Sequence, residues 1–261
     1  MRLLDWARYI RRYIKWNRPR LSQYLQTRRT LQKLDSIAFW LKHDYERIQR
    51  FYQLDVEYID FSYSIPQPTD TQPTGTSEIG SLLLGNSANP ANNHLDALFR
   101  LKKVEFNGRI ICPLSYSGGK EYTDKIAQVG HRLFGDSFEP LRSYVEKSKY
   151  YDLLDDLDAA YFYHRRQQAG GTVRYFLSRG KPVFLHPASP LLPYYRDLGV
   201  PTLYSADEFD MRLEIAPEQA RTSISALQNL FSEEAKRERY RNLLTYGTPA
   251  STAHTGAESC N

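Results

Sequence analysis

From residue 81 onward, short apolar runs alternate with longer amphipathic segments, and this alternation constrains the fold more than any other feature of the chain. Alternating β and α segments predict stacked βαβ units around a parallel sheet. Several of the short runs are almost entirely apolar, as is expected when helices cover both faces of such a sheet. Strands are expected at 81–85, 109–114, 159–164, 182–186 and 201–204. Helices are expected at 92–106, 120–133, 143–157, 172–179 and 191–198.

The regions around this alternating block predict a chain with several parts. We expect an α/β domain with a doubly wound parallel sheet over residues 81–216, which is close to the usual size of a domain. Residues 65–80 are rich in Pro, Gly and Thr, which is typical of a linker or a long surface loop. The other expected parts are a basic, mainly helical segment over 1–64, a C-terminal helix over 217–246 and a disordered tail over 247–261.

Within residues 1–64, the spacing of apolar residues predicts two helices followed by one strand. The first helix ends or kinks at Pro19, because proline disrupts a helix interior. The second helix is expected to run from Leu21 towards Phe51, with a break near Asp35 and Ser36. Residues 56–61 then alternate briefly between apolar and polar side chains, as a strand does.

Positive charge is concentrated at the start of the chain. The net charge is +5, but residues 1–50 carry thirteen Lys or Arg and four Asp or Glu, a local charge of 13 − 4 = +9 that leaves −4 for the remainder. Residues 1–20 predict a basic amphipathic helix with Trp and Tyr at its boundary, a composition found at anionic membrane surfaces. The alternative is a helix packed on the rest of the protein with a solvated basic face. No nucleic-acid partner is expected, because the acidic remainder offers no extended positive surface.

Several classes of protein are excluded by what the sequence lacks. Two cysteines cannot form a disulfide framework, so a reduced, cytoplasmic chain is expected. The sequence has neither a membrane-spanning apolar stretch nor the apolar region of a signal peptide. The acidic pair Asp156 and Asp158 ends a predicted amphipathic helix, and the six histidines lack metal-ligand spacing, so no metal is expected. There is also no GxSxG motif to suggest a hydrolase.

Polar and glycine-rich loops follow the predicted strands, where ligands bind in open parallel sheets. One of these loops combines two arginines, two glutamines and adjacent glycines before a predicted helix. Free backbone N–H groups, the helix dipole and arginine side chains all favour a diphosphate there. The alternative is a glycine-rich turn with surface arginines, since the sequence has no standard nucleotide-binding fingerprint. The candidate binding residues are Gly85, Asn86, Ser87, Tyr116, Arg165, Arg166, Gln167, Gln168, Gly170, Gly171 and Thr172.

The order and spacing of these residues, with several others, resemble a known family. The matching positions are Gly85-Asn86-Ser87, Asn92, His94, Leu98, Pro113, Tyr116, Tyr150, Asp158, Arg166-Gln167-Gln168, Gly171-Thr172, Gly180, Pro182 and Pro190. Together they resemble the TDP-N-acetylfucosamine:lipid II N-acetylfucosaminyltransferases. The resemblance covers residues 82–204, with a fainter match over 37–65.

The resemblance implies the fold, reaction and location of the protein. It implies the C-terminal Rossmann-like half of a two-domain GT-B glycosyltransferase, with an N-terminal helical segment before it. The implied reaction is metal-independent transfer of an amino-deoxyhexose from a dTDP-sugar to a polyprenyl-diphosphate-linked glycan in cell-surface polysaccharide assembly. The implied location is peripheral, on the inner face of the cell membrane.

The resemblance also implies roles for individual residues. Gly85, Asn86 and Ser87 would line the donor cleft, and the loop from Arg166 to Thr172 would hold the diphosphate and sugar. Arg166 would stabilise the negative charge that develops on the leaving nucleoside diphosphate. Tyr116 is a candidate for stacking on the base or sugar, with capping of the sheet as the alternative. His94 is expected to support the loop at Asn86.

The segment before the predicted linker departs from the family pattern. A complete GT-B enzyme has a full Rossmann-like domain there, where this sequence predicts a mostly helical segment over residues 1–64. Acceptor binding and the general base usually belong to that domain, so no catalytic base is named from the sequence. The alternative function is a non-catalytic module, derived from such an enzyme, that binds a membrane surface or a partner.

Overall fold

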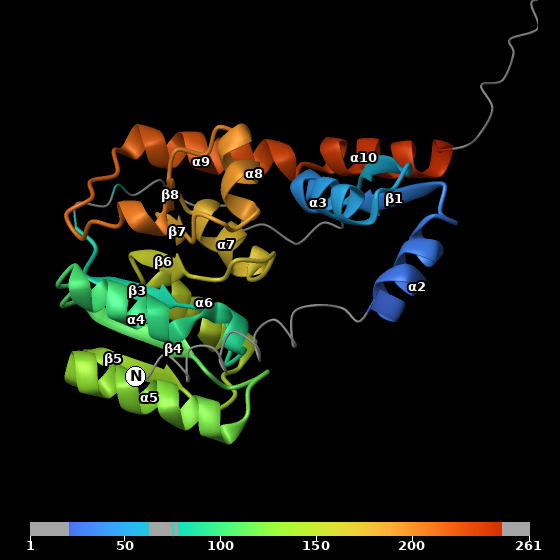
Figure 1. Cartoon of the computed structure of the whole chain (residues 1–261). Helices are drawn as coiled ribbons and strands as arrows, with labels where there is room; N and C mark the ends of the chain where they lie inside the picture. The colour runs from blue at the N-terminus through green and yellow to red at the C-terminus, as the bar shows by residue number, and fades with distance from the viewer. Residues whose placement is uncertain (1–20, 63–74, 76–77, 247–261) are drawn as a thin grey trace, which may run out of the picture.

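The computed structural model describes residues 21–62, 75 and 78–246, which form a large α/β domain and a smaller lobe beside it (Figure 1). The predicted basic helix at 1–20, the tail at 247–261 and most of the linker at 65–80 lie outside the described residues. No helix in the described ranges is long and apolar enough to cross a membrane.

The large domain is built on a six-stranded sheet in which every neighbouring pair of strands is parallel. The strand order is β5-β4-β3-β6-β7-β8, which confirms the predicted doubly wound topology. The strands are β3 (Ser81–Leu84), β4 (Arg109–Pro113), β5 (Phe138–Leu141), β6 (Ala159–Phe162), β7 (Val183–Leu185) and β8 (Leu203–Ser205).

Both faces of the sheet are buried by helices, because successive side chains of a strand point to opposite faces. Leu82 and Leu84 pack in one apolar cluster with residues of α4 and α5. Leu83 packs in the other cluster with residues of α6, α7 and α8. The bounds of these helices are α4 (His94–Lys103), α5 (Lys120–Phe134), α6 (Lys147–Asp155), α7 (Gly170–Leu177) and α8 (Leu191–Asp197).

Strand β5 was not expected from the sequence. It contains Pro140, which lacks a backbone N–H and argues against a strand in a pattern-based prediction. The structure accommodates this proline because β5 is the edge strand and pairs only with β4. The predicted helix at 143–157 correspondingly begins later, at Lys147.

The small lobe consists of a helix followed by a βαβ unit, so it contains one strand more than the sequence predicts. The expected helix from Leu21 towards Phe51 is divided into α2 (Leu21–Leu31) and α3 (Lys42–Tyr52), with β1 (Ser36–Phe39) between them. Strand β1 pairs in parallel with β2 (Glu57–Asp60), at the position of the strand expected over 56–61. Strand β1 does not alternate, because Ser36 is followed by three apolar residues, and so short an apolar run cannot be told from part of a helix by periodicity.

The predicted single helix over 217–246 is two helices, α9 (Pro217–Leu230) and α10 (Glu233–Thr245). The side chain of Ser232 begins the second helix by accepting a hydrogen bond from the N–H of Ala235. A serine at this position satisfies one of the free N–H groups of the first turn, which makes it a favourable start for a new helix. Helix α9 covers the large domain, and α10, after the interruption, reaches the small lobe (Figure 1).

The small lobe is held against the large domain by its own residues and by the C-terminal helix. Leu41, at the turn between β1 and α3, is fully buried and belongs to the apolar cluster on one face of the large sheet. Helix α10 packs on β2, where Arg239 Nε lies 3.3 Å from Asp60 Oδ2 and the rings of Tyr240 and Phe61 are 5.2 Å apart. The lobe is therefore attached both through its own turn and through the C-terminal helix.

Asp158, one of the two acidic residues discounted as metal ligands, ties the start of β3 to the loop before β6. Its Oδ2 accepts hydrogen bonds from the N–H of Gly80 at 3.0 Å and from the N–H and hydroxyl of Ser81 at 2.8 Å each. All three donors come from the beginning of one central strand. The carboxylate therefore has a structural role in this fold.

We predict that Asp158→Ala lowers the free energy of unfolding by about 2 kcal/mol, because three donors lose a charged acceptor. Urea denaturation measures the change. Asp156→Ala is the matched control, since Asp156 is exposed and accepts no side-chain hydrogen bond from the described residues. Equal effects of the two substitutions would contradict the structural role of Asp158.

Candidate functional site

The candidate site lies at the switch point of the sheet, where strands that follow one another in the chain are added on opposite sides of β3. The chain builds outward from β3 through β4 to β5, then returns to place β6 on the other side of β3. The loops after β3 and β6 leave the sheet at the same edge, and loops at such a switch point form the ligand crevice of doubly wound sheets. The Nδ2 of Asn93 also donates to the carbonyl of Tyr163 at 2.9 Å, which joins the two loops beside the switch point.

A chain of hydrogen bonds links four of the predicted binding residues across this point. Asn86, after β3, accepts a bond from Nε2 of Gln168, after β6, at 2.9 Å. Asn86 Nδ2 also lies 3.4 Å from the hydroxyl of Tyr116, after β4. Gln168 in turn accepts a bond from Nε of Arg166 at 3.3 Å. Three loops that are far apart in the sequence are thereby joined at one edge of the sheet.

The loop after β3 is shaped by a close approach between Gly85 and His94. Gly85 has a φ of +69°, and a Cβ atom there would lie 2.8 Å from Nε2 of His94. Ser87 is buried, and its hydroxyl accepts from Nδ2 of Asn92 at 3.3 Å. Of the three residues predicted to line the cleft from this loop, Asn86 presents its side chain to the other loops, and Gly85 and Ser87 shape the turn.

His94 supports this loop as a neutral side chain. It is fully buried, and its Nδ1 lies 2.9 Å from the hydroxyl of Tyr122. Burial lowers the pKa of His94 to about 4. A neutral histidine packed behind Gly85 agrees with the predicted supporting role.

A second buried histidine, His164, holds the loop that carries Arg166. Its Nδ1 lies 2.9 Å from the backbone carbonyl of Arg166, and since a carbonyl can only accept, Nδ1 carries the proton. Burial lowers the pKa of His164 to about 4, against the opposing effect of this hydrogen bond. The position of Arg166 is therefore fixed by a buried, uncharged group beneath it.

Helix α7 begins at the glycine pair and not at Thr172, two residues earlier than predicted. Ala169 precedes it with a φ of 57°, and no side chain caps the first turn. A Cβ atom added at Gly171 would meet no other atom within 4 Å, so the space in front of this helix end is open. Free N–H groups at such an end favour an anion.

A cavity of about 210 Å³ adjoins these loops. Asn86, Tyr116 and Thr172, all predicted from the sequence, line it. The other lining residues are Pro113, Ser115, Leu141, Tyr144, Val145, Lys147 and Tyr150. The sequence did not reveal most of the second group, because Tyr144 and Lys147 follow β5, the strand that it did not predict. We call this space the sheet-edge cavity.

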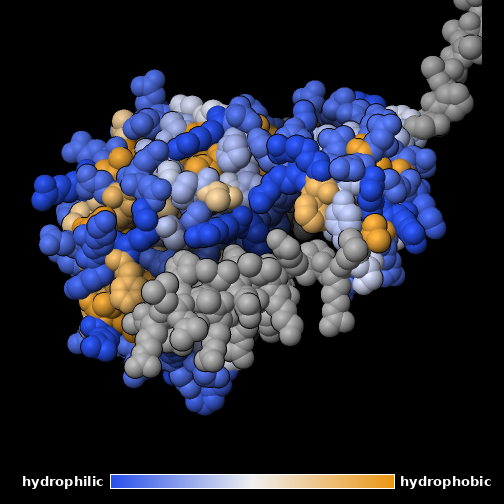
Figure 2. All heavy atoms as spheres, in the orientation of Figure 1, coloured by the Kyte–Doolittle hydropathy of each residue, from blue (hydrophilic) through white to orange (hydrophobic). Residues whose placement is uncertain are grey.

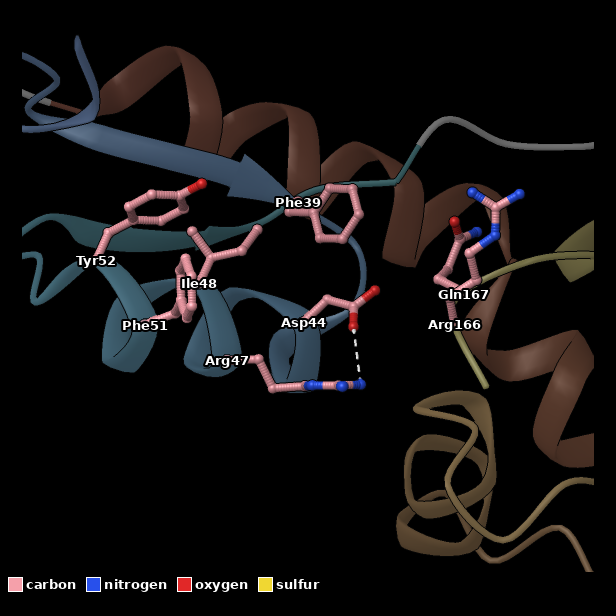
Figure 3. Close-up of a pocket in the computed structure, with 8 residues that line it drawn as sticks. All are labelled: Phe39, Asp44, Arg47, Ile48, Phe51, Tyr52, Arg166 and Gln167. Carbon is pink, nitrogen blue, oxygen red and sulfur yellow. Dashed lines mark ion pairs between the residues drawn. The ribbon is translucent and has the colours of Figure 1, made fainter. Parts of the chain in front are cut away.

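A second cavity, of about 500 Å³, lies between the small lobe and the loop after β6, and we call it the inter-lobe pocket (Figure 3). Arg166 and Gln167 line one side of it. The other side consists of small-lobe residues that the sequence did not single out: Phe39, Asp44, Arg47, Ile48, Phe51 and Tyr52. Figure 2 shows mostly hydrophilic residues on this face, with separate hydrophobic groups on both parts of the molecule.

The predicted site residues are thus distributed over two neighbouring spaces. Arg165 is exposed and lines neither cavity. Gly170 lies near the small lobe, since a Cβ atom there would be 3.4 Å from the ring of Trp40. Within the described part of the chain, no group of three or more His, Cys, Asp or Glu residues is placed to hold a metal ion.

The doubly wound sheet, with its site at the switch point and a second lobe across a pocket, defines the class of protein. These features are those of the nucleotide-sugar-dependent glycosyltransferases with the GT-B fold, the fold of the solved structures described below. The chain belongs to the 4-alpha-L-fucosyltransferase family, glycosyl transferase group 56, whose sequence profile matches residues 20–246. The match extends beyond the residues over which the sequence resemblance was found, at 20–36 and at 205–246.

Solved structures with this fold support the class. A glycosyltransferase from Rickettsia africae matches with a TM-score of 0.62 at 10% identity, over 87% of this chain and 67% of that one. Anabaena HepE, in complex with UDP and glucose, gives 0.63 at 12% identity, over 86% and 67%. The sucrose-phosphate synthase of Thermosynechococcus elongatus gives 0.62 at 12% identity, over 87% and 63%. The chain spans about two thirds of the length of these proteins.

Because His94 and His164 are buried with lowered pKa values, we predict that the free energy of unfolding depends on pH. Their folded pKa of about 4 lies below the unfolded value of 6.5, so the unfolded state binds more protons between these values. Stability should therefore rise as the pH rises from 4 to 6.5, by about 1.4 kcal/mol per pH unit for each histidine. Urea denaturation across this range measures the slope.

His94→Asn tests the contribution of one site, because the amide keeps a polar group near the position of Nδ1 without titrating. We expect the slope to decrease by about 1.4 kcal/mol per pH unit in this variant. The same substitution at the exposed His131 is the control. A slope that His94→Asn leaves unchanged would show that this histidine is protonated in the folded protein.

Proposed function

We propose that the protein transfers an amino-deoxyhexose of the N-acetylfucosamine type from a dTDP-sugar to a polyprenyl-diphosphate-linked glycan. The observation that carries the proposal is the hydrogen-bonded link from Asn86 to Gln168 and Arg166 across the switch point. It places a cationic side chain and an open helix end at the crevice where this class of sheet binds nucleotides. Family membership supports the sugar-transfer chemistry.

The sheet-edge cavity suits the nucleoside part of the donor. Its three tyrosines, Tyr116, Tyr144 and Tyr150, offer aromatic surfaces for a base, and Tyr116 is exposed. Apolar side chains of Leu141 and Val145 would contact the methyl group that distinguishes thymine from uracil. Burying one methyl contributes about 0.8 kcal/mol, which corresponds to about fourfold tighter binding of dTDP than of dUDP, the nucleotide that lacks only this methyl group.

The diphosphate is proposed to lie between Arg166 and the first turn of α7. The N–H groups of Gly170, Gly171 and Thr172 are at the positive end of the helix dipole. When the bond between sugar and diphosphate breaks, negative charge develops on the diphosphate, and these donors together with Arg166 stabilise it. In this proposal the charge stabilisation comes from the protein, and the reaction is metal-independent.

The lipid-linked acceptor is proposed to bring the protein to the inner face of the cell membrane as a peripheral protein. The +9 charge of residues 1–50 supports attraction to anionic lipids, and aromatic residues interleave with the basic ones over 1–20. Exposed apolar side chains on the small lobe, including Leu25 and Phe51, lie on the part of the chain that follows this segment.

Calorimetric titration with dTDP, UDP and GDP tests the donor site. We expect dTDP to bind most tightly, and Arg166→Ala to weaken dTDP binding about 10- to 100-fold, because a charged hydrogen bond to phosphate is lost. Arg132→Ala is the control, since this exposed arginine is near the C-terminal end of α5, at the opposite edge of the sheet. Absence of binding to all three nucleotides would contradict the proposal and favour a non-catalytic module.

Vesicle sedimentation tests the membrane contact. We expect the protein to bind phosphatidylglycerol vesicles at low salt and to release them at high salt, because screening removes the attraction. Replacing Arg8, Arg11 and Arg12 with Ser should weaken binding about fivefold for each residue. Replacing Lys102, Lys103 and Arg132 of the large domain is the matched control. Binding that is insensitive to salt and to the first set of substitutions would contradict this part of the proposal.

A further inference from the structure

The inter-lobe pocket contains a single acidic side chain among the described residues that line it, Asp44. Asp44 lies in the first turn of α3, on the small-lobe side of the pocket. Arg166 and Gln167, which belong to the proposed donor site, line the opposite side. Figure 3 shows the carboxylate of Asp44 directed across the pocket towards these two residues.

The carboxylate of Asp44 is available to a ligand. It accepts no hydrogen bond from the described residues, and 21% of its side chain is exposed. Its charged partner is Arg47, whose Nη1 is 4.0 Å from Oδ1, a distance beyond hydrogen bonding. A pair that is partly open to solvent and has this spacing contributes little to stability, so the position of Asp44 is not explained by the ion pair alone.

The surroundings of Asp44 favour proton uptake. Burial raises the pKa of its carboxyl above the ordinary aspartate value, although the positive charge of Arg47 and the nearby His43 act in the opposite direction. Across the pocket, the charged group that faces it is Arg166. A carboxylate with a raised pKa is a stronger base than an ordinary surface aspartate.

The rest of the small-lobe wall suits a sugar ring or the apolar part of an acceptor. Ile48 and Phe51 line the pocket with 39% and 55% of their surfaces exposed. The ring of Tyr52 is adjacent, with its centroid 4.8 Å from that of Phe51. A ligand on this surface would lie beside Asp44, in the pocket that Arg166 of the proposed diphosphate site lines from the other side.

We infer that Asp44 is the general base that removes the proton from the acceptor hydroxyl, an inference that rests on the proposed function. The hydroxyl oxygen attacks C1 of the donor sugar while its proton passes to the Asp44 carboxylate. The bond between C1 and the diphosphate oxygen breaks, and its electron pair leaves with the nucleoside diphosphate, which Arg166 stabilises. The products are the protonated carboxyl, the nucleoside diphosphate and a glycoside with inverted configuration at C1.

Two nucleophiles distinguish a base from a structural residue. A polyprenyl-diphosphate-linked disaccharide attacks through a hydroxyl that must lose a proton, whereas azide attacks without losing one. Release of dTDP from dTDP-N-acetylfucosamine is measured with each nucleophile for the unaltered protein, Asp44→Asn and Asp55→Asn. Asp55 is the matched control, an exposed aspartate of the same lobe that does not line the pocket.

We expect Asp44→Asn to reduce transfer to the disaccharide by about 100-fold or more, the usual contribution of a general base. Its reaction with azide, its affinity for dTDP and its urea denaturation should match those of the unaltered protein. Equal losses with both nucleophiles, or transfer to the disaccharide within a few-fold of normal, would overturn the assignment. Failure of the unaltered protein to bind dTDP would instead count against the proposed donor site.

Discussion

The pairing of β3 with β6 is the contact on which the rest of the structure depends. These two strands are neighbours in space but are separated in the chain by β4, β5 and the helices that cover them. Their pairing creates the switch point in the strand order. At this point the loop after β3 and the loop after β6 lie next to each other. Asp158 fastens the start of β3 to the segment that leads into β6, so the two strands are also tied at the edge opposite the site.

The site is supported largely by groups that take no direct part in the proposed chemistry. His94 stands behind the turn at Gly85, and His164 holds the carbonyl of Arg166. Both are buried and neutral, so uncharged side chains support the two loops, while Asn86, Gln168 and Arg166 of these loops are hydrogen-bonded to one another at the switch point. The supporting residues are thus distinct from the proposed reacting groups, and the proposed donor site lies on the sheet while the inferred general base lies on the small lobe.

The sequence predicted the large domain well because its strands carry a strong apolar signal and its loops carry glycines and arginines with distinct physical roles. It missed β5, since Pro140 contradicts strand propensity unless the strand is known to lie at an edge. It also missed β1 and the acidic side of the inter-lobe pocket. Asp44 looks like any helical surface residue in the sequence, and its setting arises only when α3 is placed opposite the loop of Arg166.

The path of α10 has a consequence for the order of folding. The small lobe is made early on the ribosome, but the helix that pairs Arg239 with Asp60 is the last described element to be synthesised. Until that helix emerges, the described contacts of the early lobe with the large domain are those of Leu41, of Trp40 with Tyr194 and of His43 with Asp197. Both walls of the inter-lobe pocket can therefore fold during translation, whereas the contacts of α10 with β2 are added only once synthesis of α10 is complete.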